Sequence, residues 1–111
     1  MDPKNFQRTS AETVILALLE ARSRHGYELA KLVESKSDSI LQFQVASIYP
    51  MLYRLERKQL VEGKWVEKAG ERRRRYYSLT PAGRKALTAQ RKIWREFFGA
   101  LSRLTGFDHV S

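Results

Sequence analysis

Residues 43–80 read FQVASIYPMLYRLERKQLVEGKWVEKAGERRRRYYSLT, and this stretch decides the fold. Its apolar residues recur first at i, i+3, i+4 and i+7: Ile48, Met51, Leu52 and Leu55. That spacing predicts an amphipathic helix over about 45–58. Two alternating runs follow, 60–67 and 72–79, with the turn sequence KAGE between them, and they predict a β-hairpin. A helix beside a basic hairpin is typical of a winged helix-turn-helix, a mainly α fold with one small β-hairpin.

The helix over 45–58 has two interpretations. It is a recognition helix in the major groove of DNA, or an ordinary amphipathic surface helix with solvated charges. In the first case the side chains that meet bases or phosphates are Gln44, Ser47, Tyr49, Tyr53 and Arg54. Pro50 disfavours a regular helix at its position, so either the helix begins nearer Ser47 or its first turns are irregular.

Four consecutive arginines, 72–75, open the second run of the hairpin. Alternate side chains of a strand point to opposite faces, so only part of the run can converge on one groove. We expect Arg72, Arg73 and Arg74 to contact DNA and Arg75, beside Tyr77, to be partly structural. The alternative is an edge strand kept soluble by its charge.

The preceding residues predict the support for this unit. Thr9 and Glu12 have capping-box spacing before an apolar pattern, which predicts a helix over about 10–22 after a loose arm at residues 1–8. His25 and Gly26 mark a boundary, and a second helix is expected over about 26–37. Alternation over 41–45 suggests a very short strand.

A long last helix is predicted over 81–105. Thr80 and Pro81 are a strong helix start, and Gly106 closes it. Its apolar stripe packs either on its own domain or on a second copy of the chain: Leu87, Ile93, Trp94, Phe97, Phe98, Leu101 and Leu104. We expect the second arrangement, with residues 1–80 as the DNA-binding domain and 81–111 as a dimerisation helix and tail. A homodimer predicts a palindromic operator.

Composition narrows the classes of function. The 111-residue chain carries a formal charge of +9, and residues 60–111 hold 12 Lys/Arg against 5 Asp/Glu. This balance favours a polyanionic partner. There is no cysteine, and neither a signal peptide nor a membrane span is evident, so a cytoplasmic protein is expected. His25 and His109 have no carboxylate at metal-ligand spacing, so we expect neither a metal, nor a cofactor, nor enzymatic activity.

The chain resembles the PadR family of transcriptional regulators over about residues 11–83. The resemblance rests on His25-Gly26-Tyr27-Glu28-Leu29, Tyr49-Pro50, Arg54-Leu55-Glu56, Arg75-Tyr76-Tyr77 and Gly83. It implies a dimeric winged-helix repressor of the short branch with one C-terminal helix, often released from DNA by a small molecule or a stress signal. Some short members bind flat aromatic ligands through a tryptophan of the last helix. The resemblance therefore implies two alternatives for Trp94, ligand binding or simple packing in the dimer interface. Gln44-Val45-Ala46 departs from the Ser/Thr cap and glycine common in the family.

The sequence therefore predicts a sequence-specific transcriptional regulator that binds double-stranded DNA as a homodimer. Two rival functions keep the same fold: a winged helix that binds RNA, and a protein-interaction module that binds no operator. Competition between duplex DNA and structured RNA separates the first rival, and loss of retention on duplex DNA indicates the second.

Overall fold

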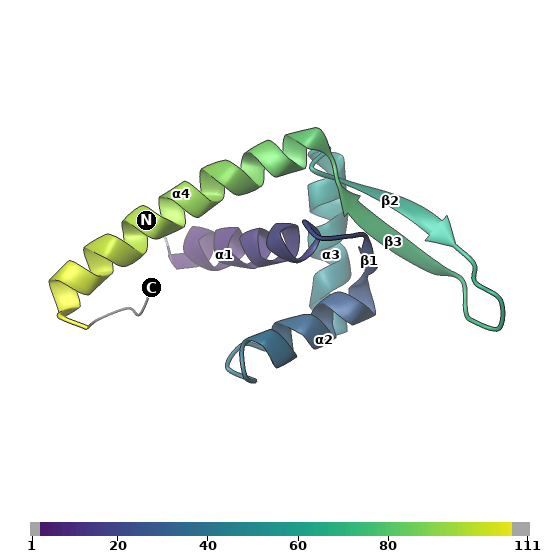
Figure 1. Ribbon diagram of the computed structural model, residues 1–111, viewed down its shortest axis with the longest axis horizontal. Coiled ribbons are helices and arrows are strands. Elements are labelled where there is room, and N and C mark those ends of the chain that lie inside the picture. The colour runs from purple at the N-terminus through teal and green to yellow at the C-terminus, as the bar shows by residue number, and fades with distance from the viewer. Residues whose placement is uncertain (1–2, 108–111) are drawn as a thin grey trace.

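The computed structural model describes residues 3–107, with side chains from Ser10 onward. The described residues form seven elements: α1 (Pro3–Leu18), β1 (Arg24–His25), α2 (Gly26–Lys36), α3 (Val45–Arg57), β2 (Val61–Val66), β3 (Arg74–Leu79) and α4 (Pro81–Thr105). The strands form one antiparallel sheet in the order β1-β3-β2. The β2–β3 hairpin projects beyond the helices at one end, and α4 runs along α1 toward the other (Figure 1). The predicted mainly helical fold with a small hairpin and a long C-terminal helix is confirmed.

One apolar core joins these elements. It lies where α1, α2 and α3 meet the base of the hairpin and the start of α4, and the side chains at its centre are fully buried: Ile15, Leu16, Leu29, Ile48, Leu52, Leu55, Tyr77 and Leu87. The four apolar residues that predicted α3 are all buried, as their spacing requires. Leu87 is only 1% exposed within its own chain, so its assignment to a dimer interface is wrong.

The ends of α4 follow from local sequence. Thr80 is the N-cap, and its Oγ1 accepts a hydrogen bond from the Gly83 N–H at 3.0 Å. Pro81 occupies the first turn, where its missing N–H costs nothing. Gly106 ends the helix in the left-handed conformation, φ 77°, and its N–H bonds to the Ser102 carbonyl. All three residues act as the sequence predicted.

The helix α3 begins at Val45 and contains Pro50. Of the two expected arrangements, a later start near Ser47 is therefore wrong. Gln44 is extended at the N-cap position and provides no side-chain cap. The Ser47 N–H donates instead to the Gln44 backbone carbonyl at 2.9 Å.

Two predictions for the N-terminal segment are wrong. The first helix is Pro3–Leu18 rather than 10–22, so Thr9 lies within it and does not cap it. Of the arm predicted at residues 1–8, residues 3–8 are helical, and Met1 and Asp2 lie outside the described residues.

No strand forms at 41–45 either. The free edge of β3 is taken instead by β1, through the pairs Arg24–Tyr77 and His25–Tyr76. A strand needs a partner edge, and the alternation at 41–45 has none.

Candidate nucleic-acid interface

The exposed face of α3 carries most of the predicted contact residues. Gln44, Ser47 and Tyr53 are exposed, and Tyr53 is 49% accessible. Tyr49 is half-buried because its ring lies on the start of α2, where a Cβ added to Gly26 would come within 2.8 Å of the ring. Glycine at position 26 therefore allows the close approach that orients Tyr49. The sequence motif Tyr49-Pro50 thus includes a side chain with a packing function.

Arg54 lies differently from its neighbours on α3. Its Nε is 3.8 Å from a carboxylate oxygen of Glu12, and Lys58 Nζ is 3.5 Å from the other oxygen. Glu12 is 6% exposed and belongs to α1. A buried carboxylate requires such cations, so Arg54 joins α3 to α1 within the chain. The Arg54 side chain is 35% exposed, so it is less open to solvent than Tyr53.

The arginine run divides between two faces of the hairpin, as the alternation predicted. Arg72 and Arg73 precede β3 and are exposed, whereas Arg74 and Arg75 begin the strand. Val66 pairs with Arg74 and Trp65 with Arg75. Directly opposed residues of antiparallel strands share a face, so Arg75 and Trp65 lie on one side and Arg74 on the other.

Arg75 fixes the hairpin to α3. Its Nη2 donates to Glu56 Oε2 at 2.7 Å, and its guanidinium lies 5.4 Å from the centre of the Tyr77 ring. The side chain passes over Gly63, where an added Cβ would come within 2.8 Å of the guanidinium carbon. The partly structural role predicted for Arg75 is confirmed, and this arginine is not available as a free cation.

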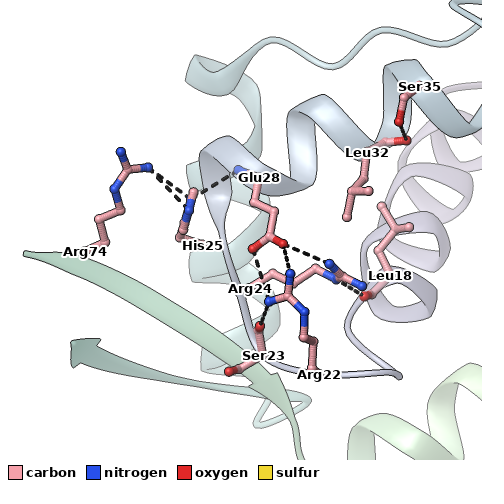
Figure 2. Close-up of polar contacts among 9 residues, drawn as sticks. All are labelled: Leu18, Arg22, Ser23, Arg24, His25, Glu28, Leu32, Ser35 and Arg74. Carbon is pink, nitrogen blue, oxygen red and sulfur yellow. Dashed lines mark hydrogen bonds and ion pairs between the residues drawn. The ribbon is translucent and has the colours of Figure 1, made fainter. Parts of the chain in front are cut away.

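Arg74 belongs to a polar cluster at the start of α2 (Figure 2). Its Nη1 is 3.4 Å from both ring nitrogens of His25. His25 caps α2, since its Nδ1 accepts the Glu28 N–H at 3.1 Å. Burial and the neighbouring Arg74 charge lower the pKa of His25, which keeps the ring neutral and able to cap. The helix-boundary role predicted for His25 is confirmed.

Glu28 connects this cluster to the rest of the domain. Its carboxylate binds the guanidinium groups of Arg22 and Arg24, the latter at 2.9 Å, and Arg24 Nε also donates to the Leu18 carbonyl at 2.8 Å. Figure 2 shows both arginines converging on this carboxylate. Desolvation opposes ionisation, but the two arginines together lower the pKa of Glu28. The end of α1, strand β1 and the start of α2 are thereby held together.

Polar contacts with α1 and the segment after it hold the first half of α4. Thr13 Oγ1 donates to Gln90 Oε1 at 2.5 Å, and Glu20 binds Arg91 through bonds of 2.9 and 3.0 Å. Beyond Arg91 the remaining predicted interface residues are exposed or half-buried: Ile93, Trp94, Phe97, Phe98, Leu101 and Leu104. Leu104 is 85% exposed. This part of α4 thus presents an apolar face that the described side chains cover only in part.

A cleft of about 560 Å³ lies between α1 and α4, and Thr13, Val14, Leu41, Trp94 and Phe98 are among its lining residues. Its walls are mainly apolar side chains, so it suits an apolar occupant. Among residues 3–107, no three His, Asp or Glu side chains are grouped as metal ligands would be. No helix in the described part of the chain is both long and apolar enough to cross a bilayer.

Comparison with known proteins gives concordant matches. The model of the "Transcriptional regulator PadR-like family" matches residues 15–89. Transcriptional regulator Rv3488 of Mycobacterium tuberculosis is 34% identical over 107 residues, covering 93% of this chain and 96% of that protein.

Solved structures match over similar lengths. A transcriptional regulator from Clostridium thermocellum, 26% identical, superposes with a TM-score of 0.81 over 91% of this chain and 98% of that one. Bacillus subtilis PadR in complex with operator DNA shares the fold at 20% identity, with a TM-score of 0.66 over 72% of this chain and 46% of that one.

Proposed function

This chain belongs to the PadR-like family of transcriptional regulators, and from that premise we propose that it represses transcription by binding operator DNA as a homodimer. The family is one of regulators and not a class of enzymes. The observation that carries the proposal is the hairpin. Arg72, Arg73 and Arg74 have no carboxylate partner among the described residues, and they line a groove together with Val45 and Tyr49 of α3.

In the proposed complex α3 enters the major groove. Gln44, Ser47 and Tyr53 meet base edges or phosphates, and Tyr49, whose ring packs against the start of α2, contacts the DNA backbone. Arg72, Arg73 and Arg74 bind phosphates at the edge of the same groove. The Bacillus subtilis relative bound to operator DNA supports duplex DNA as the partner. Arg54 is left out of this contact set because Glu12 engages it.

The exposed half of α4 supports the homodimer. A helix of 25 residues is about 38 Å long, and several apolar side chains of its second half are exposed: Ile93, Phe98 and Leu104. We assign the apolar face from Ile93 to Leu104 to a second copy of α4. Residues 1–80 then form the DNA-binding unit and 81–111 the dimerisation unit. Two-fold pairing would place both copies of α3 on one side of a palindromic operator.

The cleft between α1 and α4 supports a small effector. Its apolar walls, with Trp94 and Phe98, fit a flat aromatic molecule. Because one wall is the proposed dimerisation helix, an occupant that binds one arrangement of the dimer better than the other would shift DNA affinity. Release from the operator by such a molecule, or by a stress signal acting at the same helix, completes the proposal.

The test begins with selection of bound fragments from a random duplex pool and titration of the resulting operator by fluorescence anisotropy. Arg73→Ala and Arg74→Ala should weaken binding to all duplexes, and each should reduce the slope of log K against log salt by about one. Lys85→Ala, an exposed cation on α4, is the control for a simple change of net charge. Undiminished binding of both arginine variants to random duplex contradicts the wing's role. Preference for structured RNA at equal salt contradicts the DNA assignment.

A further inference from the structure

A groove separates α3 from the inner face of the hairpin. Its volume is about 370 Å³, and its walls are Val45 and Tyr49 from α3, Trp65 from β2, Tyr27 from α2 and the arginines 72–75. The walls include four arginines and no carboxylate, and one of the four, Arg75, is already paired with Glu56. The second hairpin groove, on the opposite face, differs because Glu28 and Glu71 line it. The groove beside α3 therefore favours an occupant that carries negative charge.

Trp65 lines this groove but does not belong to the apolar core. It pairs with Arg75 across the hairpin and shares its face with Val61 and Gly63. Val61 is buried in the core, but Trp65 lies farther out and is 59% exposed. A large exposed indole on a projecting hairpin leaves apolar surface in water, which suits a binding contact better than a packing residue.

Arg73 is held against this indole. Its guanidinium carbon lies 4.9 Å from the centre of the Trp65 ring, within the range of a cation–π contact. The contact leaves the guanidinium N–H groups available for an anion. Trp65 therefore combines an apolar surface with the positioning of one of the cations that lack a carboxylate partner.

A deoxyribose-phosphate strand alternates the two features that this groove accepts, a charged phosphate and an apolar sugar face. We propose that the DNA strand bordering the major groove passes between α3 and the hairpin, with Trp65 against a deoxyribose and Arg73 on the adjacent phosphate. This inference rests on the proposed function, because it requires α3 to occupy the major groove. It adds Trp65 and Tyr27 to the interface, which the sequence pattern alone had not included.

The experiment uses the full chain labelled with 5-fluorotryptophan. The sequence has two tryptophans, Trp65 and Trp94, so the ¹⁹F spectrum should hold two signals, assigned with Trp65→Phe. The signal of Trp65 should move with the H₂O/D₂O ratio in the free protein. On saturation with a mixed-sequence duplex, this solvent shift should disappear. Anisotropy of a labelled duplex is measured on the same samples.

Affinity provides the second measurement. Trp65→Ala should weaken duplex binding by on the order of tenfold, the loss typical of an important aromatic contact. Trp65→Phe keeps an aromatic platform and should stay within about twofold of the original chain. Val66→Ala, the adjacent residue on the opposite face of β2, is the matched control and should leave binding unchanged.

The outcomes separate the two proposals. Duplex binding with an unchanged Trp65 solvent shift, or with equal affinity for Trp65→Ala and Val66→Ala, overturns the strand path and leaves the proposed function standing. Failure to bind duplex DNA even at low salt overturns the proposed function and this inference together.

Discussion

Gly83→Ala tests the junction between the hairpin and α4. A Cβ at this position would lie 2.0 Å from the Leu60 carbonyl oxygen, a distance that real contacts do not show. The same oxygen accepts the Thr80 N–H at 3.2 Å, and Thr80 Oγ1 in turn accepts the Gly83 N–H. Because backbone atoms surround the site, the new methyl group cannot be accommodated by turning a side chain. The helix start must move, and its cap must weaken with it.

The expected loss follows from three contributions. Forcing extra atoms into a packed site costs about 1–3 kcal/mol, and weakening an N-cap costs about 1 kcal/mol more. The better helix propensity of alanine offsets about 1 kcal/mol. Since the overlap involves backbone, we expect the upper end of this range, a loss of about 3 kcal/mol in the free energy of unfolding. For a domain of this size that lowers Tm by about 10 °C or more.

Gly99→Ala is the matched control in the same helix. Its Cβ would meet only the end of the Arg103 side chain, at 3.4 Å, so the substitution should raise stability by up to about 1 kcal/mol. Both variants are compared by thermal and urea unfolding at one protein concentration, because association contributes to apparent stability. If Gly83→Ala unfolds at or above the Tm of Gly99→Ala, the close approach of Leu60 to α4 does not exist.

Three further variants test other contacts. The pKa of His25 is lowered from 6.5, so the stability that neutral His25 contributes is complete above pH 6.5 and declines as the pH falls below that value. The His25→Asn variant keeps a capping side chain that does not titrate. The urea midpoint of this variant should therefore fall less than that of the original chain between pH 7 and about pH 5. Phe97→Asp would place a charge on the proposed dimer face and should give monomers in sedimentation, whereas a persistent dimer would refute that interface. Glu12→Gln removes the charge that faces Arg54 and should cost about 1–3 kcal/mol in urea unfolding; an unchanged midpoint would show that the ion pair contributes nothing.

Helix caps and apolar spacing correctly predicted the elements whose position depends on neighbouring residues alone. Thr80, Pro81 and Gly106 define both ends of α4, and the apolar spacing within 45–58 defines α3. The two-residue strand β1 has no pattern of its own, because it exists only where the edge of β3 is available. Element boundaries that depend on a distant partner could not be predicted from the residues alone.

The candidate site shows the same division. Alternation in the hairpin correctly separated Arg75 from its neighbours, since strand geometry alone decides the face. The helical pattern could predict on which side of α3 Arg54 lies. It could not predict that the long side chain turns toward the buried carboxylate of Glu12, 42 positions earlier in the chain. Alternation also places Trp65 on the α3 side of the hairpin, so that signal was present. Its exposure depends on how far the hairpin extends past α3, which only the fold reveals.

The bond between Arg75 and Glu56 has a mechanical consequence. It ties the projecting hairpin to α3, and Gly63 leaves room for the Arg75 side chain to lie flat against the strand. The spacing between α3 and the β2–β3 hairpin is thereby set in the free protein, before any duplex binds. When the protein spacing is fixed, the DNA must change its own shape to fit between the two elements. Sequences that bend or narrow cheaply would then be favoured at base pairs the protein never touches.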